Sequence, residues 1–254
     1  MGTNSPEPKA TRYHRVISFR GEASAEPDIA LLARAITEPA RAAMLVHLLD
    51  GRSWTATELA KIAAIKPPAA SAHLRMLLDC ALVKVTPNGR HRYYRLAGSR
   101  VAQLMEQLQC NAPRQPVKTP GALRASASLA TCRLCYDHLA GRLAVAITEA
   151  MVKRTWLVEA EPWFHLSDRG AEALRALKVP AAVGRTCMDW SERRLHLAGE
   201  LGRLLSEALL QRKLLQRDLK SRAIRITDRG REEIPAIFDG SLGELIAGPA
   251  SQGR

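Results

Sequence analysis

The sequence is poor in aromatic residues and contains no long apolar run. Aromatic residues make up 4% of its 254 residues, which argues against a protein that binds single strands by stacking bases on exposed rings. No stretch of about 18 or more apolar residues occurs, so no transmembrane helix is expected. The segment Met1–Arg20 has charges and prolines but lacks the apolar centre of a secretory signal. These absences predict a cytoplasmic protein.

Cysteine is also sparse. The chain has five cysteines, an odd and sparse set for 254 residues. A framework of structural disulfides is therefore not expected, which leaves the thiols for packing, metal binding or redox sensing. The five are Cys80, Cys110, Cys132, Cys135 and Cys187.

Acidic residues are too few to balance the basic ones. The sequence has 38 lysines and arginines against 25 aspartates and glutamates, a formal net charge of +13. This excess predicts a polyanionic partner, and nucleic acid is favoured over an anionic membrane surface. A generally basic, arginine-rich composition would give the same total, so charge alone does not decide the function.

Composition divides the chain into four segments. Residues 1–25 are polar and show no periodicity, which predicts a disordered arm. Residues 28–110 carry helix and hairpin patterns, whereas residues 111–131 are rich in Pro, Ala, Ser and Gly, as linkers are. Residues 132–247 are then expected to form a C-terminal, duplicated sensor or effector domain. The expected fold class is mainly α with small β-hairpins (α+β).

The first domain is expected to begin with helices. Thr37 as N-cap and Pro39 in the first turn predict the start of one helix. Thr55 or Thr57 caps a short second helix. A third helix starts at the Pro67-Pro68 pair, because proline is tolerated only in the first turn.

A hairpin and a last helix complete this domain. Two β-prone runs, 82–86 and 92–96, flank Pro87-Asn88-Gly89-Arg90, and Asn-Gly is a strong signal for a type I′ turn. Residues 98–109 place apolar side chains at helical spacing. This order is typical of a winged helix-turn-helix, whose third helix enters the major groove while the ribbon lies along nearby phosphates. The residues predicted to contact DNA are Lys66, Ser71, His73, Arg75, Lys84, Arg90, His91 and Arg92.

The segment ELAKIAAIKPPAASAHLRMLLDCALVKVTPNGRHRYYRL, which ends at Leu96, resembles the ArsR/SmtB family of bacterial winged-helix repressors. It contains E-L-A, P-A-x-S-x-H-L-x-x-L and L-V followed by G-R-x-x-Y-Y-x-L. The resemblance implies a homodimer formed through helices near Ile29–Ile36 and Val101–Leu108, and repression by operator binding that a ligand relieves. The dimerisation residues that it implies are Val101, Leu104, Met105 and Leu108.

Two departures from the family pattern concern the cap of the third helix and the metal sites. Ala81 stands where the family usually has glycine, at a helix end that favours positive φ. Thr55 and Thr57 occupy the positions of the Cys-x-Cys pair of metal-sensing members. The last helix also lacks the Asp, His and Glu set that other members use for zinc. Neither of these two family metal sites is therefore expected here.

The second half contains an internal repeat. The sequence His138-Leu139-Ala140-Gly141 recurs at 196–199, and Leu166-Ser167-Asp168-Arg169-Gly170 recurs as Ile226-Thr227-Asp228-Arg229-Gly230. Each unit has the pattern of an apolar helix, a hairpin and a helix capped by Ser or Thr. The repeat predicts a duplicated, degenerate pair of winged helices with a cleft along its midline.

Two sets of residues in this half are candidates for an effector site. The first set consists of thiols and imidazoles, whose spacing is compatible with binding a metal or metalloid or with redox sensing, although packing is the more common role of such residues; they are Cys132, Cys135, His138, Cys187 and His196. The second set consists of aromatic residues, which either line an apolar pocket for an organic effector or, at least as commonly, fill the core; they are Tyr136, Trp156, Trp163 and Trp190.

The favoured function is a dimeric, sequence-specific repressor of the bacterial cytoplasm, controlled by an effector in the C-terminal domain. A nucleoid-type protein that binds duplex without sequence preference is the main alternative. An enzyme with an accessory winged helix is a weaker one, because the sequence has no Gly-x-Ser-x-Gly, P-loop, dinucleotide fingerprint or His-Glu-x-x-His. We therefore predict that the protein is not an enzyme, and the sequence names no cofactor.

Overall fold

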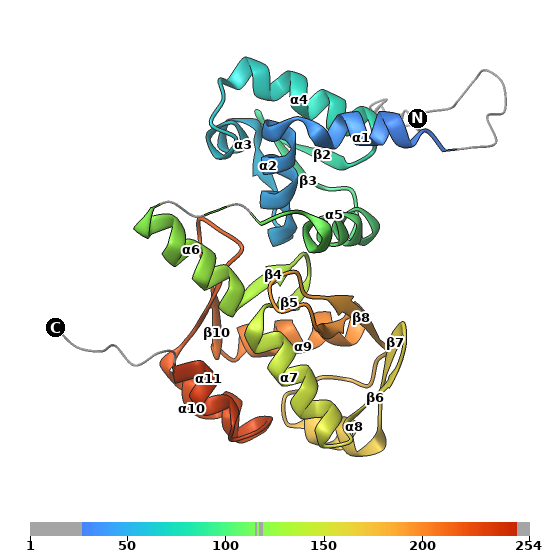
Figure 1. The fold of residues 1–254 in the computed structure, drawn as a ribbon, viewed down its shortest axis with the longest axis vertical. Helices are drawn as coiled ribbons and strands as arrows, with labels where there is room; N and C mark the ends of the chain where they lie inside the picture. Colours follow the sequence, from blue (N-terminus) through green and yellow to red (C-terminus); the bar gives the residue numbers. More distant parts are fainter. Residues whose placement is uncertain (1–26, 115, 117–118, 248–254) are drawn as a thin grey trace, which may run out of the picture.

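In the computed structural model the chain folds into two stacked units (Figure 1). The structure describes residues 27–114, 116 and 119–247, so the predicted arm at 1–25 lies outside the described residues. We call residues 29–111 the head and residues 132–247 the C-terminal unit. Each unit is built around an apolar core of its own. None of the helices in the described part of the chain is long and apolar enough to cross a membrane.

The head is a winged helix-turn-helix. Its elements are α1 (Ile29–Thr37), α2 (Pro39–His47), η1 (Leu48–Asp50), β1 (Trp54–Thr55), α3 (Ala56–Ile62), α4 (Pro67–Asp79), β2 (Val83–Asn88), β3 (His91–Leu96) and α5 (Ser99–Asn111). The strands form one antiparallel sheet in the order β1-β3-β2. The core is made by apolar side chains of α2, α3, α4 and the sheet, with Leu45, Leu59, Leu74 and Leu96 fully buried. This packing leaves one side of α4 and the β2–β3 hairpin free to meet a ligand.

Side-chain caps explain where α2 and α3 begin. The Thr55 hydroxyl accepts from the Glu58 N–H, and the Glu58 carboxylate accepts from the Thr55 N–H, which is a complete capping box. Thr55 rather than Thr57 is therefore the N-cap of α3. The prediction of Thr37 as the cap of α2 is wrong, because Thr37 ends α1 and the Glu38 side chain accepts from the Ala40 N–H.

The end of α4 and the wing tip show two local departures from expectation. Ala81 has φ +53°, so the left-handed position that usually takes glycine is kept here with a Cβ. In the wing, Asn88 pairs with His91, which makes Gly89-Arg90 the centre of the turn. Gly89 alone of these two has positive φ, at +57°, as a type II′ turn requires. The expected type I′ turn centred on Asn88-Gly89 is therefore wrong by one residue.

The predicted linker at 111–131 contains a helix. This is α6 (Pro120–Thr131), which begins with Pro120 and is capped by the Thr119 hydroxyl accepting from the Ala122 N–H. Alanine has the highest helix propensity, and proline is favoured in the first turn of a helix that has an N-cap. These preferences outweighed the linker-like composition of the segment. No residue of α6 is buried, so the helix adds little to either core.

The C-terminal unit repeats the order strand, strand, helix, strand, strand, helix. The first set is β4 (Arg133–Cys135), β5 (His138–Ala140), α7 (Arg142–Lys153), β6 (Leu157–Ala160), β7 (Trp163–Leu166) and α8 (Asp168–Arg175). The second set is β8 (Gly184–Met188), β9 (Leu195–Ala198), α9 (Gly199–Gln211), β10 (Leu215–Arg217), β11 (Ile224–Ile226) and α10 (Asp228–Ile237), after which α11 (Leu242–Ala247) ends the described chain. The sheets are β4-β5, β6-β7-β8-β9 and β10-β11, all antiparallel.

The two sets contact each other through equivalent residues. The Ser206 hydroxyl of α9 accepts from the Leu139 N–H of β5, and the Thr148 hydroxyl of α7 accepts from the Leu197 N–H of β9, both at 2.9 Å. Each helix thus satisfies a backbone donor of the other set. That the two sets are degenerate winged helices stays a prediction.

Candidate functional site

The residues predicted to contact DNA lie on α4 and the wing. All but one are exposed; these are Lys66, Ser71, Arg75, Lys84, Arg90, His91 and Arg92. His73 is half-buried instead, and its Nδ1 lies 3.1 Å from a guanidinium nitrogen of Arg41 on α2. Arg41 also donates to the carbonyls of Arg34 and Ala35, so it ties α1, α2 and α4 together. The structure therefore places His73 in the support of α4 rather than on its free surface.

The residues implied in dimerisation lie on α5, on the side of the head that faces the C-terminal unit (Figure 1). Met105 is buried in the head core, and Val101 packs against the same core. Leu104 is half-buried, whereas Leu108 is 41% exposed. Met105 is therefore a core residue of its own chain, and Leu108 is the one of the four with the most surface to offer a partner.

The aromatic residues proposed to line an effector pocket do not lie together. Trp156 is buried in the core of the C-terminal unit, with its ring 6.3 Å from that of Phe238. Trp163 is 42% exposed on β7, and Trp190 packs against the guanidinium of Arg133 at 4.5 Å. Tyr136 packs against the head core. The core-filling alternative describes Trp156 better than the pocket does.

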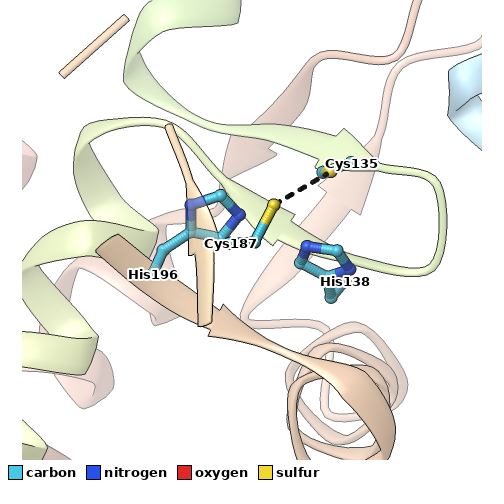
Figure 2. Close-up of side chains that lie close together, drawn as sticks. All are labelled: Cys135, His138, Cys187 and His196. Carbon is cyan, nitrogen blue, oxygen red and sulfur yellow. Dashed lines mark hydrogen bonds between the residues drawn. The ribbon is translucent and has the colours of Figure 1, made fainter. Parts of the chain in front are cut away.

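Four of the five thiol and imidazole candidates come together at one point. The possible ligand atoms of Cys135, His138, Cys187 and His196 all lie within 4.8 Å of one another. We call these four residues the Cys2His2 cluster. Figure 2 shows the two imidazole rings on either side of the Cys187 sulfur, with Cys135 beyond it. The sulfurs of Cys135 and Cys187 are 4.0 Å apart.

Strand register explains why these residues meet. Cys135 on β4 is the cross-strand partner of His138 on β5, and Cys187 on β8 is the cross-strand partner of His196 on β9. Paired residues in an antiparallel ladder point to the same face. Each hairpin therefore supplies one thiol and one imidazole, and the packing of the two hairpins brings the pairs together.

Cys132 lies outside the cluster, in the apolar core of the C-terminal unit. It is three residues before Cys135, and positions three apart along an extended strand face opposite sides of the sheet. The Cys132-x-x-Cys135 spacing therefore does not present two thiols to one ion here. Burial raises the pKa of the Cys132 thiol to about 12, as expected for a packing residue.

The cluster is buried and surrounded by acidic side chains. Cys135, His138, Cys187 and His196 are 2%, 6%, 9% and 0% exposed. His138 Nδ1 lies 3.0 Å from the Asp137 carboxylate, and His196 Nδ1 lies 3.8 Å from the Asp189 carboxylate. Asp189 in turn accepts from Arg133 at 2.9 Å and from the Gly141 N–H at 2.6 Å. Asp137 was not among the residues singled out from the sequence.

The cluster electrostatics favour a charged sulfur on Cys187. A hydrogen bond from Cys135 lowers the pKa of the Cys187 thiol most, and the two imidazoles lower it further, which together outweighs burial. The same hydrogen bond raises the pKa of Cys135. Burial would lower the pKa of His138, but Asp137 and Cys187 raise it to about 9. The cluster can thus hold a thiolate beside a proton donor.

Two further contacts join the cluster region to the head. The Tyr136 N–H donates to the Leu49 carbonyl at 2.7 Å, and Arg222 forms a buried ion pair with Glu106 of α5 at 2.6 Å. A cavity of about 370 Å³ also opens between α5 and the strands that carry the cluster. Cluster residues Cys135, His138 and Cys187 line it together with Gln103 and Gln107 of α5, among others.

Comparison with known proteins identifies the head and extends to the second unit. The model of the family described as bacterial regulatory protein, arsR family, matches residues 38–85. The uncharacterized HTH-type transcriptional regulator YdfF of Bacillus subtilis is 39% identical over 213 residues, which cover 81% of this chain and 94% of YdfF. The chain belongs to the ArsR family of transcriptional regulators. The family and the winged helix-turn-helix predicted from the sequence are thus confirmed.

Other similarities are shorter. The HTH-type transcriptional regulator CmtR of Mycobacterium tuberculosis is 37% identical over 83 residues, 33% of this chain and 70% of CmtR. The crystal structure of the transcriptional repressor BigR from Xylella fastidiosa is 26% identical, covers 34% of this chain and 88% of BigR, and has a TM-score of 0.31. These two matches are too short to span both units, whereas the match to YdfF reaches well into the C-terminal unit of this ArsR-family regulator.

Proposed function

We propose that this ArsR-family protein is a homodimeric repressor that binds operator duplex through α4 and the β2–β3 wing. An effector bound to the C-terminal unit controls it, and it acts on the bacterial nucleoid in the cytoplasm. Its role is regulatory rather than catalytic. The observation that carries the proposal is the exposed, basic wing tip beside the free side of α4, on a head of the ArsR family.

The wing and α4 have the chemistry for duplex DNA. Arg90 and Arg92 are exposed at the wing tip, where guanidinium groups meet phosphates or the narrow minor groove. Arg75 is exposed on α4 and can reach base edges from the major groove. The formal net charge of +13 adds long-range attraction to the polyanion.

The exposed apolar side chains of the head fit dimerisation through α1 and α5. Ile29 on α1 is 75% exposed and Leu108 on α5 is 41% exposed. Apolar side chains with this exposure gain free energy when a partner covers them. Because Met105 is used in its own core, we expect Ile29 and Leu108 rather than Met105 to contact the partner chain.

The proposal is tested by fluorescence anisotropy with a duplex from the protein's own promoter and a scrambled duplex of equal length. We expect the promoter duplex to bind about 10³-fold more tightly or better. Arg90→Ala should weaken binding to both duplexes and lower the salt slope by about one. The matched control is Arg175→Ala, which removes an exposed arginine from α8 of the C-terminal unit and should leave the slope unchanged.

Equal affinity for the two duplexes would overturn the repressor proposal. The net charge of +13 favours that second candidate, a nucleoid-type protein that binds duplex without sequence preference. Light scattering of the free protein tests the dimer separately. A monomer at micromolar concentration, or a dimer unaffected by Leu108→Glu, would contradict the assignment of α5 as a dimer helix.

A further inference from the structure

We propose that Cys135, His138, Cys187 and His196 bind one soft divalent metal ion of the zinc class, and that this ion is the effector. The metal site stands on its own geometry, whereas its regulatory role rests on the proposed function as a DNA-binding repressor. Two thiolates and two imidazoles are a donor set that tetrahedral zinc takes in proteins. They also disfavour magnesium and calcium, which prefer oxygen ligands.

The distances within the cluster are close to those of a loaded site. Two sulfurs that each lie ~2.3 Å from a tetrahedral metal are about 3.8 Å apart. The sulfurs of Cys135 and Cys187 are 4.0 Å apart. All four donor atoms fall within 4.8 Å of one another, so a contraction of about 1 Å or less would bring them into the first coordination sphere.

Unpartnered polar atoms point to a missing ligand at the same place. Among the described residues, His138 Nε2 and both ring nitrogens of His196 are buried without a hydrogen-bond partner. Buried polar atoms are rarely left in this state, because water or protein normally satisfies them. A metal ion at the centre of the cluster would satisfy one nitrogen of each ring.

The surroundings of the rings match those of metal-binding histidines. A ligating imidazole usually has a carboxylate or carbonyl at its other nitrogen, which fixes the ring and strengthens it as a donor. Asp137 lies 3.0 Å from His138 Nδ1, and Asp189 lies 3.8 Å from His196 Nδ1. In His138 this leaves Nε2 for the metal; in His196 the Asp189 carboxylate is on the Nδ1 side but beyond hydrogen-bond distance, which also favours Nε2 as the ligand. Two thiolates also balance the charge of a divalent ion, and the thiol protons leave to solvent on binding.

A cavity leads to the buried cluster, and the strands of the cluster contact the head. The 370 Å³ cavity beside α5 reaches Cys135, His138 and Cys187. The residue after each cysteine contacts the head: the Tyr136 N–H donates to the Leu49 carbonyl, and the Met188 carbonyl accepts from the Cys110 thiol of α5. An ion that holds the two sulfurs together would therefore fix two points of contact with the head relative to each other. This gives the metal a physical route to the helices proposed to form the dimer.

The first experiment titrates Co²⁺ into the reduced, metal-stripped, full-length protein. We expect one equivalent to produce the visible absorption of tetrahedral cobalt and the near-ultraviolet bands of sulfur bound to cobalt, and Zn²⁺ but not Mg²⁺ to remove both. Cys135→Ala and Cys187→Ala should abolish the saturable binding. Cys132→Ala is the matched control, because it removes a buried thiol three residues from Cys135 that lies in the core, and it should bind cobalt normally.

Several results would overturn the metal site. The first is the absence of saturable cobalt binding, and the second is a loss of cobalt binding in Cys132→Ala equal to that in Cys135→Ala. The third is a reduced protein that does not bind metal but forms a Cys135–Cys187 disulfide in air, which would make the pair a redox switch. His196→Gln guards against variants that fail to fold. It should keep native circular dichroism and the sulfur bands, with weaker affinity for cobalt, and unchanged affinity in a folded variant would also contradict the site.

The second experiment measures operator binding by anisotropy with and without Zn²⁺. We expect Zn²⁺ to change the affinity by about fivefold or more, and Cys187→Ala to remove that response while still binding the operator. Metal binding without any change in the affinity for operator would overturn the effector role, but the metal site itself would still stand. Failure to bind any operator would overturn the proposed function, and the cobalt result would still stand.

Discussion

The buried ion pair between Glu106 and Arg222 provides a quantitative test of how the two units are joined. Glu106 lies on α5 of the head, and Arg222 precedes β11 of the C-terminal unit. Their side chains are 1% and 5% exposed, and the charged atoms are 2.6 Å apart. Glu106→Gln keeps the shape of the side chain and removes its charge, so Arg222 would be left as an uncompensated buried cation.

The expected loss in the free energy of unfolding is at the lower end of the range for such changes. Removing one partner of a buried ion pair costs about 3–5 kcal/mol. Arg222 would keep the Gln109 side-chain oxygen at 2.9 Å and the Leu134 carbonyl at 3.4 Å. Because these two acceptors remain, we expect a loss of about 3 kcal/mol for Glu106→Gln.

Urea denaturation followed by circular dichroism measures this loss. Glu200→Gln is the control, because it makes the same chemical change in an exposed pair with Arg203, and it should leave the midpoint nearly unchanged. The double variant Glu106→Gln/Arg222→Met leaves no buried charge and should lose less than Glu106→Gln alone. A loss below about 1 kcal/mol for Glu106→Gln, or a double variant that loses as much as Glu106→Gln or more, would refute the reasoning.

Three further changes test the local structure by thermal or urea unfolding. Gly51→Ala would place a Cβ 2.4 Å from the Tyr136 carbonyl oxygen at φ +73°, so it should lose at least about 1–2 kcal/mol, whereas Gly98→Ala has no neighbour within 4 Å and should be nearly neutral. Ala81→Gly removes the Cβ from a residue with φ +53° at the end of α4, so the free energy of unfolding should rise by about 1 kcal/mol; a fall would show that the backbone at this position is not strained. Thr55→Ala removes the cap of α3 and should lose about 1 kcal/mol, while an unchanged midpoint would mean that the capping box adds nothing.

The head could be predicted from sequence because its signals are local. The Thr55 cap lies three residues from its Glu58 partner, and the Pro67-Pro68 pair marks the first turn of α4. The errors arose where two local signals competed. Asn88-Gly89 favoured one hairpin turn, and the pairing of Asn88 with His91 selected another. In α6, helix propensity outweighed a composition typical of linkers.

The cluster could be predicted only in part, because it depends on contacts between distant strands. The sequence named its four residues, but it grouped them with Cys132 on the strength of a Cys-x-x-Cys spacing. Strand pairing decides which thiol faces the imidazoles, and that register is not visible in a single sequence. The same limit hid the ion pair of Arg133 with Asp189, whose residues are 56 positions apart.

The repeated order of elements in the C-terminal unit supplies two similar hairpins to the proposed metal site. One hairpin offers a single thiol and a single imidazole on one face, as Cys135 and His138 do, and two ligands hold a zinc-class ion weakly. The second hairpin repeats the pair with Cys187 and His196 across a longer loop, so packing the two sets together doubles the ligands. The ion would then stabilise the packed arrangement of the sets over any other. Because the residue after each cysteine contacts the head, that preference would bias the geometry in which the head meets DNA.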